Sequence, residues 1–321
     1  MRRADGGTRA RQSNQRDTAM TGPTAAADRY RGRFAPTPSG PLHLGSLVTA
    51  LASFLAARHA GGDWLLRIDD LDAPRCRPEH VDSILRQLEA HGLHWDETVR
   101  YQSGHTAEYD AAFERLLAGG HCYRCTCTRA VLAASSSPGI DGPVYPGTCR
   151  HGTRDQGPAA WRLRVPAGTV TLDDAVQGRL VRDLDRDVGD FVIRRADGRI
   201  GYQLASVVDE AAQGITALVR GADLVGSSLR QTLLMRLLDQ PPPAFLHIPV
   251  LLDVAGNKLS KQNHAAPIGS ETAAQNLIRC LTLLGQTAFA ADWHGRVDDI
   301  LARAIRDWDP ALIPRRLALP S

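Results

Sequence analysis

The chain has 321 residues, of which 43% are hydrophobic and 23% charged, and its net charge is +3. No apolar run reaches the roughly 18 residues of a membrane-spanning helix, and residues 1–29 contain no apolar segment typical of a signal peptide. These features exclude a membrane protein and a secreted precursor, and we expect a soluble, monomeric, cytoplasmic globular protein.

The first 29 residues are polar, contain glycine and serine, and show no hydrophobic periodicity, so we expect 1–29 to be a disordered extension. Residues 1–19 hold five arginines and two aspartates, which account for the whole net charge. The extension is either an RNA-binding arm or the result of a start assigned upstream of Met20. Elsewhere basic and acidic residues balance, so RNA contacts there would depend on local arginine patches.

A strand is predicted for 30–35 and a helix for 47–59, where apolar residues recur at helical spacing. The free N–H groups at the start of such a helix form an anion site. In the intervening loop His43 can donate a hydrogen bond to a phosphate, and Gly45 leaves room for a base or phosphate to approach. A lone histidine at a helix start is more often simply a cap, so the loop alone is a weak signal.

The rest of the chain predicts a nucleotide-binding α/β domain that is interrupted by an insertion. We expect a strand at 63–68, helices at 78–91, 108–117 and 229–238, a short strand at 161–165 and another at 247–254. The predicted units are a catalytic domain of 30–120 and 188–240, an insertion of 121–187, and a region of 241–321 that ends in a small helical part.

Six cysteines are present, and four of them fall in the predicted insertion. Cys125, Cys127 and Cys149 supply three soft ligands suited to tetrahedral zinc, and a cysteine cluster in a cytosolic chain favours metal over disulfides. Chemistry alone leaves the fourth ligand open. The candidates are Cys122, His121, His151 and Tyr145. The alternative is that the cysteines are buried as small apolar residues.

Only two of the 38 basic residues are lysines, Lys258 and Lys261. A composition so rich in arginine indicates that these two positions need an ammonium group. They flank Leu259 and Ser260, and mobile ammonium groups suit the phosphate oxygens of a nucleotide. The alternative for an isolated pair of this spacing is a solvated turn.

These motifs together resemble the class I aminoacyl-tRNA synthetases. Residues 43–46 (HLGS) resemble the "HIGH" signature, and residues 258–262 (KLSKQ) resemble the "KMSKS" signature. Three further segments narrow the resemblance to the glutamyl branch: 32–40 (GRFAPTPSG), 67–72 (RIDDLD) and 219–224 (VRGADL). The resemblance implies a Rossmann-type catalytic domain with an inserted zinc-binding connective subdomain and a short C-terminal helical region.

Only 59 residues follow Gln262, too few for the separate anticodon-binding domain of a full synthetase. The chain therefore resembles the truncated glutamyl-queuosine tRNA(Asp) synthetases. The resemblance implies ATP-dependent activation of L-glutamate without tRNA, and transfer to the queuosine base in the anticodon loop of tRNA(Asp). It also implies one structural Zn²⁺ per chain, with Tyr145 as the fourth ligand beside Cys125, Cys127 and Cys149. Mg²⁺ is expected with ATP.

The resemblance also carries roles onto individual positions. His43 and Lys261 are the expected catalytic residues. ATP is expected to bind at Pro36, Thr37, His43, Gly45, Ser46, Lys258 and Lys261. Glutamate is expected to bind at Arg33, Phe34, Ala35, Pro36, Thr37, Asp69, Tyr202 and Arg220. Arginine forks suit its carboxylates, and Asp69 suits its ammonium; for any other arginine a surface ion pair is the ordinary role.

Two positions depart from the family pattern. Asp69 stands where Glu is usual, so its contact with the substrate ammonium needs a water or a backbone shift. Ser46 replaces the second histidine of the signature, which leaves more of the charge stabilisation to Lys261.

Two other functions stay open: a conventional ligase that charges a tRNA 3′ end, and a non-catalytic, zinc-stabilised RNA-binding paralogue.

Overall fold

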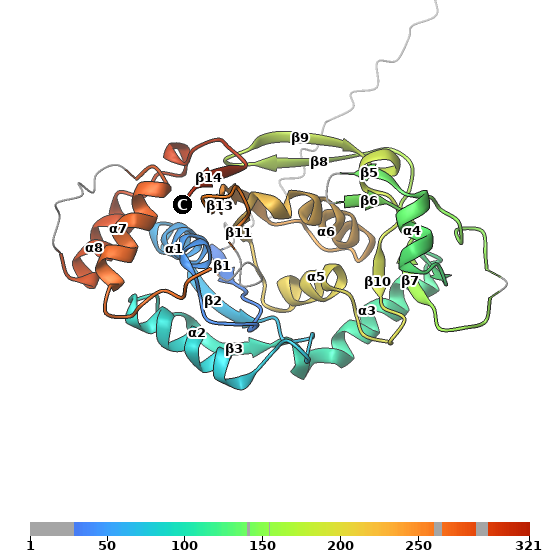
Figure 1. Cartoon of the computed structure of the whole chain (residues 1–321), viewed down its shortest axis with the longest axis horizontal. Coiled ribbons are helices and arrows are strands. Elements are labelled where there is room, and N and C mark those ends of the chain that lie inside the picture. Colours follow the sequence, from blue (N-terminus) through green and yellow to red (C-terminus); the bar gives the residue numbers. More distant parts are fainter. Residues whose placement is uncertain (1–28, 140–141, 154, 260–264, 287–294) are drawn as a thin grey trace, which may run out of the picture.

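The computed structural model describes residues 29–139, 142–153, 155–259, 265–286 and 295–321 (Figure 1). Residues 1–28 of the predicted disordered extension lie outside this part, as do Ser260, Lys261 and Gln262 of the lysine loop. Within the described ranges no helix is both long and apolar enough to cross a membrane.

The centre of the fold is a twisted sheet of parallel strands: β1 (Arg31–Phe34), β2 (Asp63–Ile68), β3 (Asp96–Tyr101), β11 (Ala217–Gly221) and β12 (Ala244–Ile248). β2 pairs with β1 and β3, and β11 pairs with β12. The N–H of Thr216 donates to the carbonyl of Arg31, so β11 continues the sheet beside β1. The resulting order, β3-β2-β1-β11-β12, grows outward on both sides of its centre and confirms the Rossmann-like prediction.

Successive strand residues point into two cores, one on each face of the sheet. Trp64 and Leu66 join the first core, whereas Leu65 between them joins the second. Val219 and Leu218 of β11 divide in the same way. Side chains alternate along a strand, so a sheet covered on both faces needs nearly continuous apolar strands.

Eight α-helices fall within the described residues. The first core holds α1 (Leu44–His59), α2 (Pro78–Ala90), α7 (Ala273–Leu283) and α8 (Val297–Arg306). The second holds α3 (Thr106–Ala118), α5 (Tyr202–Ala212) and α6 (Val225–Leu237), while α4 (Arg129–Ser135) lies in the insertion. Figure 1 shows α7 and α8 beside α1, at the opposite end of the molecule from α4. The predicted helix 47–59 begins three residues earlier, because His43 rather than a later residue caps it.

The insertion has its own antiparallel sheet of β4 (Cys122–Cys125), β7 (Ala160–Leu163) and β10 (Val192–Arg194), with a hairpin of β5 (Ser137–Gly139) and β6 (Gly142–Val144). A second hairpin, β8 (Thr169–Asp174) and β9 (Gly178–Asp183), instead extends the central sheet, where Asp174 pairs with Phe245 of β12. Strand pairing therefore crosses the predicted limits of the insertion in both directions.

The predicted strand 247–254 is wrong as a single element. Pro249 separates β12, which pairs with β11, from β13 (Val250–Leu252), which pairs with β14 (Ala318–Pro320). Proline has no N–H with which to continue the ladder. The chain thus changes partners at Pro249, and residues near the C-terminus return to support the strand that leads into the lysine loop.

Candidate active site

A cavity of about 660 Å³ opens at the carboxyl ends of β1 and β11. These are the two adjacent strands from which the sheet grows in opposite directions, the usual ligand position in doubly wound folds. All predicted ATP and glutamate residues that the structure describes line it. They are Arg33, Phe34, Ala35, Pro36, Thr37, His43, Gly45, Ser46, Asp69, Tyr202, Arg220 and Lys258. The fold brings these positions together, while their individual roles remain predictions and Lys261 lies outside the described residues.

His43 sits at the start of α1 and is nearly buried. Its Nδ1 accepts a hydrogen bond from the N–H of Ser46 at 3.3 Å, so in the neutral ring the proton lies on Nε2, which is the donor atom of the ring. A Cβ on Gly45 would lie 3.2 Å from this ring. His43 is therefore both a cap and a candidate phosphate donor, and Gly45 provides the space for its ring.

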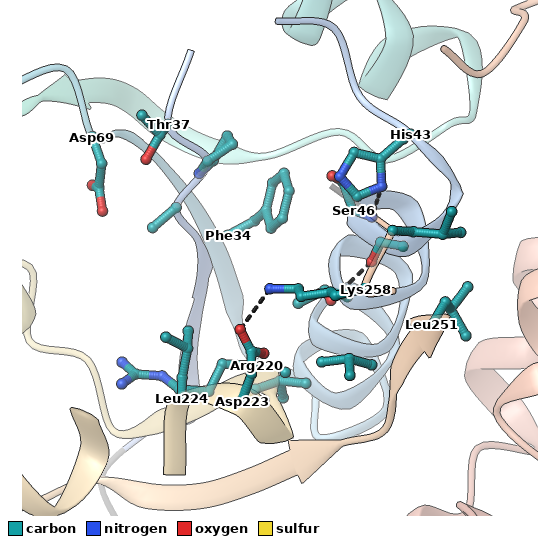
Figure 2. Close-up of a pocket in the computed structure, with 18 of the residues that line it drawn as sticks. Phe34, Thr37, His43, Ser46, Asp69, Arg220, Asp223, Leu224, Leu251 and Lys258 are labelled. Atoms are coloured by element: carbon teal, nitrogen blue, oxygen red, sulfur yellow. Dashed lines mark hydrogen bonds and ion pairs between the residues drawn. The ribbon is translucent and has the colours of Figure 1, made fainter. Parts of the chain in front are cut away.

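Lys258 lines the same part of the cavity, with its ammonium group directed toward Asp223 (Figure 2). Its Nζ lies 2.5 Å from Oδ2 of Asp223, a residue of the 219–224 motif to which sequence reasoning assigned no role. The Leu252–Lys258 bridge fixes the lysine backbone beside β13. Figure 2 shows His43, Ser46 and Lys258 near the start of α1, with Asp69 beside Thr37 farther along the cavity.

A cluster of six buried charges forms the other part of the cavity and the layer behind it. It consists of Arg33, Arg67, Arg220, Asp69, Asp209 and Glu210. Three positive and three negative charges balance within it. Burial of ionised groups is tolerated only with such pairing, because each lone charge would cost several kcal/mol.

Arg67 links the acids of this cluster. Its Nε donates to Asp69 at 2.7 Å and lies 3.5 Å from Asp209, while its Nη1 lies 3.5 Å from Glu210. Arg67 belongs to the 67–72 motif but was not among the predicted site residues. The signal in the sequence is its position two residues before Asp69, since residues two apart on a strand share one face.

Asp209 and Glu210 were also missed. They lie seven and eight residues after Tyr202 on α5, a helical spacing that places them on the face of that residue. Burial acts to raise the pKa of Glu210, but Arg33, Arg67 and Arg220 outweigh it, so the pKa is lowered. Glu210 is therefore held as a carboxylate.

The two predicted substrate arginines differ in the hydrogen-bond partners of their guanidinium groups. Arg33 directs Nε and Nη2 to one oxygen of Glu210, at 3.1 and 2.9 Å. Arg220 uses Nη1 for Gln231 and Ser228, at 2.7 and 3.2 Å. Its Nε and Nη2 are buried without a hydrogen-bond partner among the described residues, and Nη2 lies 3.5 Å from the Glu210 oxygen that Arg33 contacts. Burial lowers the pKa of Arg220, and the charge of Arg33 acts in the same direction. An anion in the cavity would satisfy this fork.

Asp69 is suited to a cation. Burial raises its pKa above the usual range although Arg67 opposes the shift. A second positive group on the cavity side would favour the ionised form. The cavity thus offers an unsatisfied cationic fork and a carboxylate, the pair that an amino acid with an additional carboxylate requires.

The three cysteines predicted as ligands converge in the insertion. The sulfurs of Cys125, Cys127 and Cys149 lie within 4.8 Å of one another, and the Tyr145 hydroxyl is 3.4 and 3.5 Å from the first two. A tetrahedral zinc site with bonds of about 2.3 Å separates its sulfurs by roughly 3.8 Å. The donor set therefore fits a metal ion. Arg162, which sequence reasoning missed, donates to Cys125 at 3.2 Å and covers the Tyr145 ring.

The other candidates for the fourth ligand do not join this group. Cys122 packs into the second core, where burial raises the pKa of its thiol to about 12. Neither His121 nor His151 belongs to a cluster with metal-ligand geometry among the described residues. Of the four residues that chemistry left open, the geometry favours Tyr145.

Comparisons with known proteins agree with this architecture. Residues 29–291 match the family described as tRNA synthetases class I (E and Q), catalytic domain. The Glutamyl-Q tRNA(Asp) synthetase of Chromobacterium violaceum is 51% identical over 286 residues, 89% of this chain and 95% of that protein. The Glutamyl-Q tRNA(Asp) synthetase of Dechloromonas aromatica is 49% identical over 290 residues, 89% of this chain and 96% of that protein.

A solved structure supports the fold. The crystal structure of glutamate-tRNA synthetase from Elizabethkingia anophelis aligns with a TM-score of 0.77 at 23% identity. The match covers 92% of this chain and 68% of that one.

Proposed function

The chain belongs to the class I tRNA synthetases of the E and Q group, and within it to the glutamyl-Q tRNA(Asp) synthetase family, and on this premise we propose its reaction. The protein activates L-glutamate with ATP, without tRNA, and transfers the glutamyl group to the queuosine base in the anticodon loop of tRNA(Asp). It acts as a cytoplasmic monomer.

The observation that carries the substrate assignment is the pattern of charged groups in the part of the cavity farther from the start of α1. The unsatisfied Nε and Nη2 of Arg220 receive a carboxylate of glutamate, and Asp69 receives its ammonium. Arg33 remains beside them as a second positive group, and Tyr202 covers the opening with its ring and hydroxyl. Phe34, Ala35, Pro36 and Thr37 complete the wall.

ATP occupies the part of the cavity at the start of α1. Pro36, Thr37, Gly45 and Ser46 surround the nucleotide there. His43 donates from Nε2 to a phosphate oxygen, and the ammonium groups of Lys258 and Lys261 hold the phosphates. Mg²⁺ bound with ATP neutralises part of the triphosphate charge.

The first step is in-line displacement at the α-phosphorus. An oxygen of the glutamate carboxylate forms a bond to phosphorus while the bond to the bridging oxygen of pyrophosphate breaks, which yields glutamyl-adenylate. The attacking group is already ionised, so no side chain has to remove a proton. His43 and Lys261 stabilise the charge that develops on the phosphate oxygens.

In the second step a hydroxyl of the queuosine ring attacks the activated carbonyl carbon. An ester bond forms, AMP leaves with the bonding electrons, and the hydroxyl proton is released to solvent. The tRNA is thus modified at its anticodon loop rather than charged at its 3′ end.

We further propose that Cys125, Cys127, Tyr145 and Cys149 hold one Zn²⁺ and that the insertion is a zinc-binding subdomain. The convergence of four donors in a segment with only a small apolar cluster of its own supports this. Zinc there would cross-link β4, the Tyr145 loop and Cys149.

Pyrophosphate exchange tests the activation step, and labelled glutamate tests the acceptor. We expect glutamate-dependent exchange without tRNA, and label on tRNA(Asp) only when it carries queuosine. Label on the 3′ end of tRNA(Glu) would instead indicate a conventional ligase. Absence of glutamate-dependent exchange would indicate a non-catalytic RNA-binding paralogue.

A further inference from the structure

Arg220 is the end of a buried chain of hydrogen bonds that starts 46 positions earlier in the sequence, at Asp174. Asp174 Oδ2 lies 2.6 Å from Nδ1 of His247, and Nε2 of His247 lies 2.8 Å from the hydroxyl of Ser228. The same hydroxyl lies 3.2 Å from Nη1 of Arg220. All four side chains are buried, and they come from β8, β12, α6 and β11.

The chemistry of the groups sets the direction of these bonds. Asp174 accepts, so Nδ1 of His247 carries the proton and Nε2 is an acceptor. Burial lowers the pKa of His247, against the opposing pull of Asp174, and Arg220 acts in the same direction as burial. The neutral ring therefore presents Nε2 as an acceptor 2.8 Å from the hydroxyl of Ser228, whose proton it shares with the carbonyl of Leu224 at 3.1 Å. The lone pairs of this hydroxyl accept from the Arg220 guanidinium.

The Asp174 end is fixed by the backbone. Its Oδ1 accepts from the N–H groups of Val176 and Gln177, at 3.0 and 2.7 Å, in the turn between β8 and β9. Its Oδ2 also accepts from the N–H of His247 at 3.0 Å. Although burial acts to raise it, these bonds and the His247 ring lower the pKa of Asp174. A rigid anion thus anchors the chain of bonds.

We propose that His247, anchored by Asp174, is a positioning residue that orients Arg220 through Ser228 for the carboxylate of glutamate. This rests on the proposed function. Ser228 and Gln231 hold Nη1 on the protein side, which leaves Nε and Nη2 as the edge that has no hydrogen-bond partner among the described residues, with Nη2 3.5 Å from Glu210. A guanidinium that is held in this way loses less conformational freedom when the substrate binds.

The arrangement of Asp174, His247 and Ser228 is not a nucleophilic triad. The hydroxyl of Ser228 is fully buried, is engaged with Arg220, and lies 3.1 Å from the carbonyl of Leu224. Ser228 does not line the cavity. No substrate carbonyl can reach it, and the cavity-lining residue that its hydroxyl contacts is Arg220.

The test is Ser228→Ala in the full chain, with Ser206→Ala as the matched control. Ser206 is an equally buried helical serine whose hydroxyl has no hydrogen-bond partner among the described residues. Loss of a hydrogen bond to a charged group predicts a rise of about 10- to 100-fold in the KM for glutamate in pyrophosphate exchange. The KM for ATP should stay within about twofold, and Ser206→Ala should change neither.

Two further variants keep the test decisive if Ser228→Ala does not fold. His247→Gln places an amide near the Nε2 position and can still accept from Ser228, whereas His247→Asn places its amide near Nδ1 and cannot. We expect the glutamine variant to retain a lower KM for glutamate than the asparagine variant. In an Arg220→Lys background, Ser228→Ala should add less than about a twofold effect, because the two changes remove one contact.

The positioning role is wrong if Ser228→Ala matches Ser206→Ala, if the KM values for glutamate and ATP rise together, or if its effect persists undiminished beside Arg220→Lys. These outcomes require that the unmutated protein performs glutamate-dependent exchange. If it does not, the proposed function itself fails. Calorimetric titration with glutamate, which needs no turnover, then shows whether the amino-acid site exists and whether Ser228→Ala weakens it.

Discussion

Arg33 directs two of its nitrogens to a single oxygen of Glu210, a residue 177 positions later in the chain. The ion pair is buried at both ends. A substrate carboxylate that meets Arg33 therefore meets a guanidinium that already donates two hydrogen bonds to Glu210. Arg220 lies farther from that carboxylate, with Nη2 at 3.5 Å, and its Nε and Nη2 have no hydrogen-bond partner among the described residues. The two arginines therefore have different roles. Arg33 balances the buried charge of Glu210, and Arg220 provides hydrogen-bond donors for a substrate carboxylate.

Replacement of Arg33 by leucine should abolish glutamate activation while ATP binding changes little. The substitution removes a positive group from the glutamate end of the cavity and leaves Glu210 short of a partner, a loss of several kcal/mol for a buried charge. Exchange kinetics and ATP titration measure the two effects. Arg179→Leu, which alters an exposed ion pair, is the control and should behave as the unmutated protein.

The same pocket should reject glutamine. Its amide presents N–H donors to an arginine that also only donates, so activation should be lower than for glutamate by about 10³-fold or more. Aspartate should fail as well, because its side chain is one methylene too short while its ammonium stays on Asp69. Similar exchange rates with glutamine and glutamate would refute the pocket assignment.

Lys261→Ala should reduce adenylate formation by about 10²- to 10³-fold, the effect of losing one donor that stabilises the developing charge. Lys261→Arg should restore little, since a planar guanidinium cannot replace a mobile ammonium there. The measurement is the single-turnover rate of glutamyl-adenylate formation at saturating ATP. A near-normal alanine variant would exclude the phosphate-binding role of the lysine loop.

The purified protein should contain one zinc per chain. Cys149→Ser should lose the metal and loosen the insertion, and Tyr145→Phe should weaken metal retention, whereas Cys76→Ser and Cys280→Ser should keep full occupancy. Elemental analysis before and after a chelator measures this. Loss of zinc in Cys122→Ser together with retention in Tyr145→Phe would show that the proposed ligand set is wrong.

His91 should make stability depend on pH. It is fully buried, its ring lies 2.6 Å from the carbonyl of Gln87 and 3.1 Å from the amide of Asn276, and burial lowers its pKa below 6.5. Below pH 6.5 the unfolded chain therefore binds a proton that the folded chain does not. The free energy of unfolding should fall as the pH is lowered from 6.5 toward the folded pKa, by at most about 1.4 kcal/mol per pH unit.

Urea titrations of the unmutated protein and of His91→Gln between pH 5 and 7.5 check this expectation. The variant loses two hydrogen bonds and should be less stable at pH 7.5. The difference between the two proteins should narrow as the pH falls, because only the unmutated chain carries this histidine. A difference that stays constant across the range would contradict a neutral, buried His91.

Local patterns in the sequence were enough for the elements that surround the site. Apolar periodicity predicted β2 and α2 closely, and proline marked the start of α2, because these signals depend on neighbours only a few residues away. The motif residues predicted for ATP and glutamate all line one cavity where they are described. The break at Pro249 was missed because the second strand exists only through pairing with β14.

The sequence by itself determined the family, the doubly wound α/β class and the positions of the signature residues, since each depends on residue type and local spacing. Only the tertiary structure decided which charges neutralise one another. The pairing of Arg33 with Glu210 and of Asp174 with His247 joins segments far apart in the chain. Burial makes such pairing obligatory but does not specify the partner, which depends on how the helices cross the sheet.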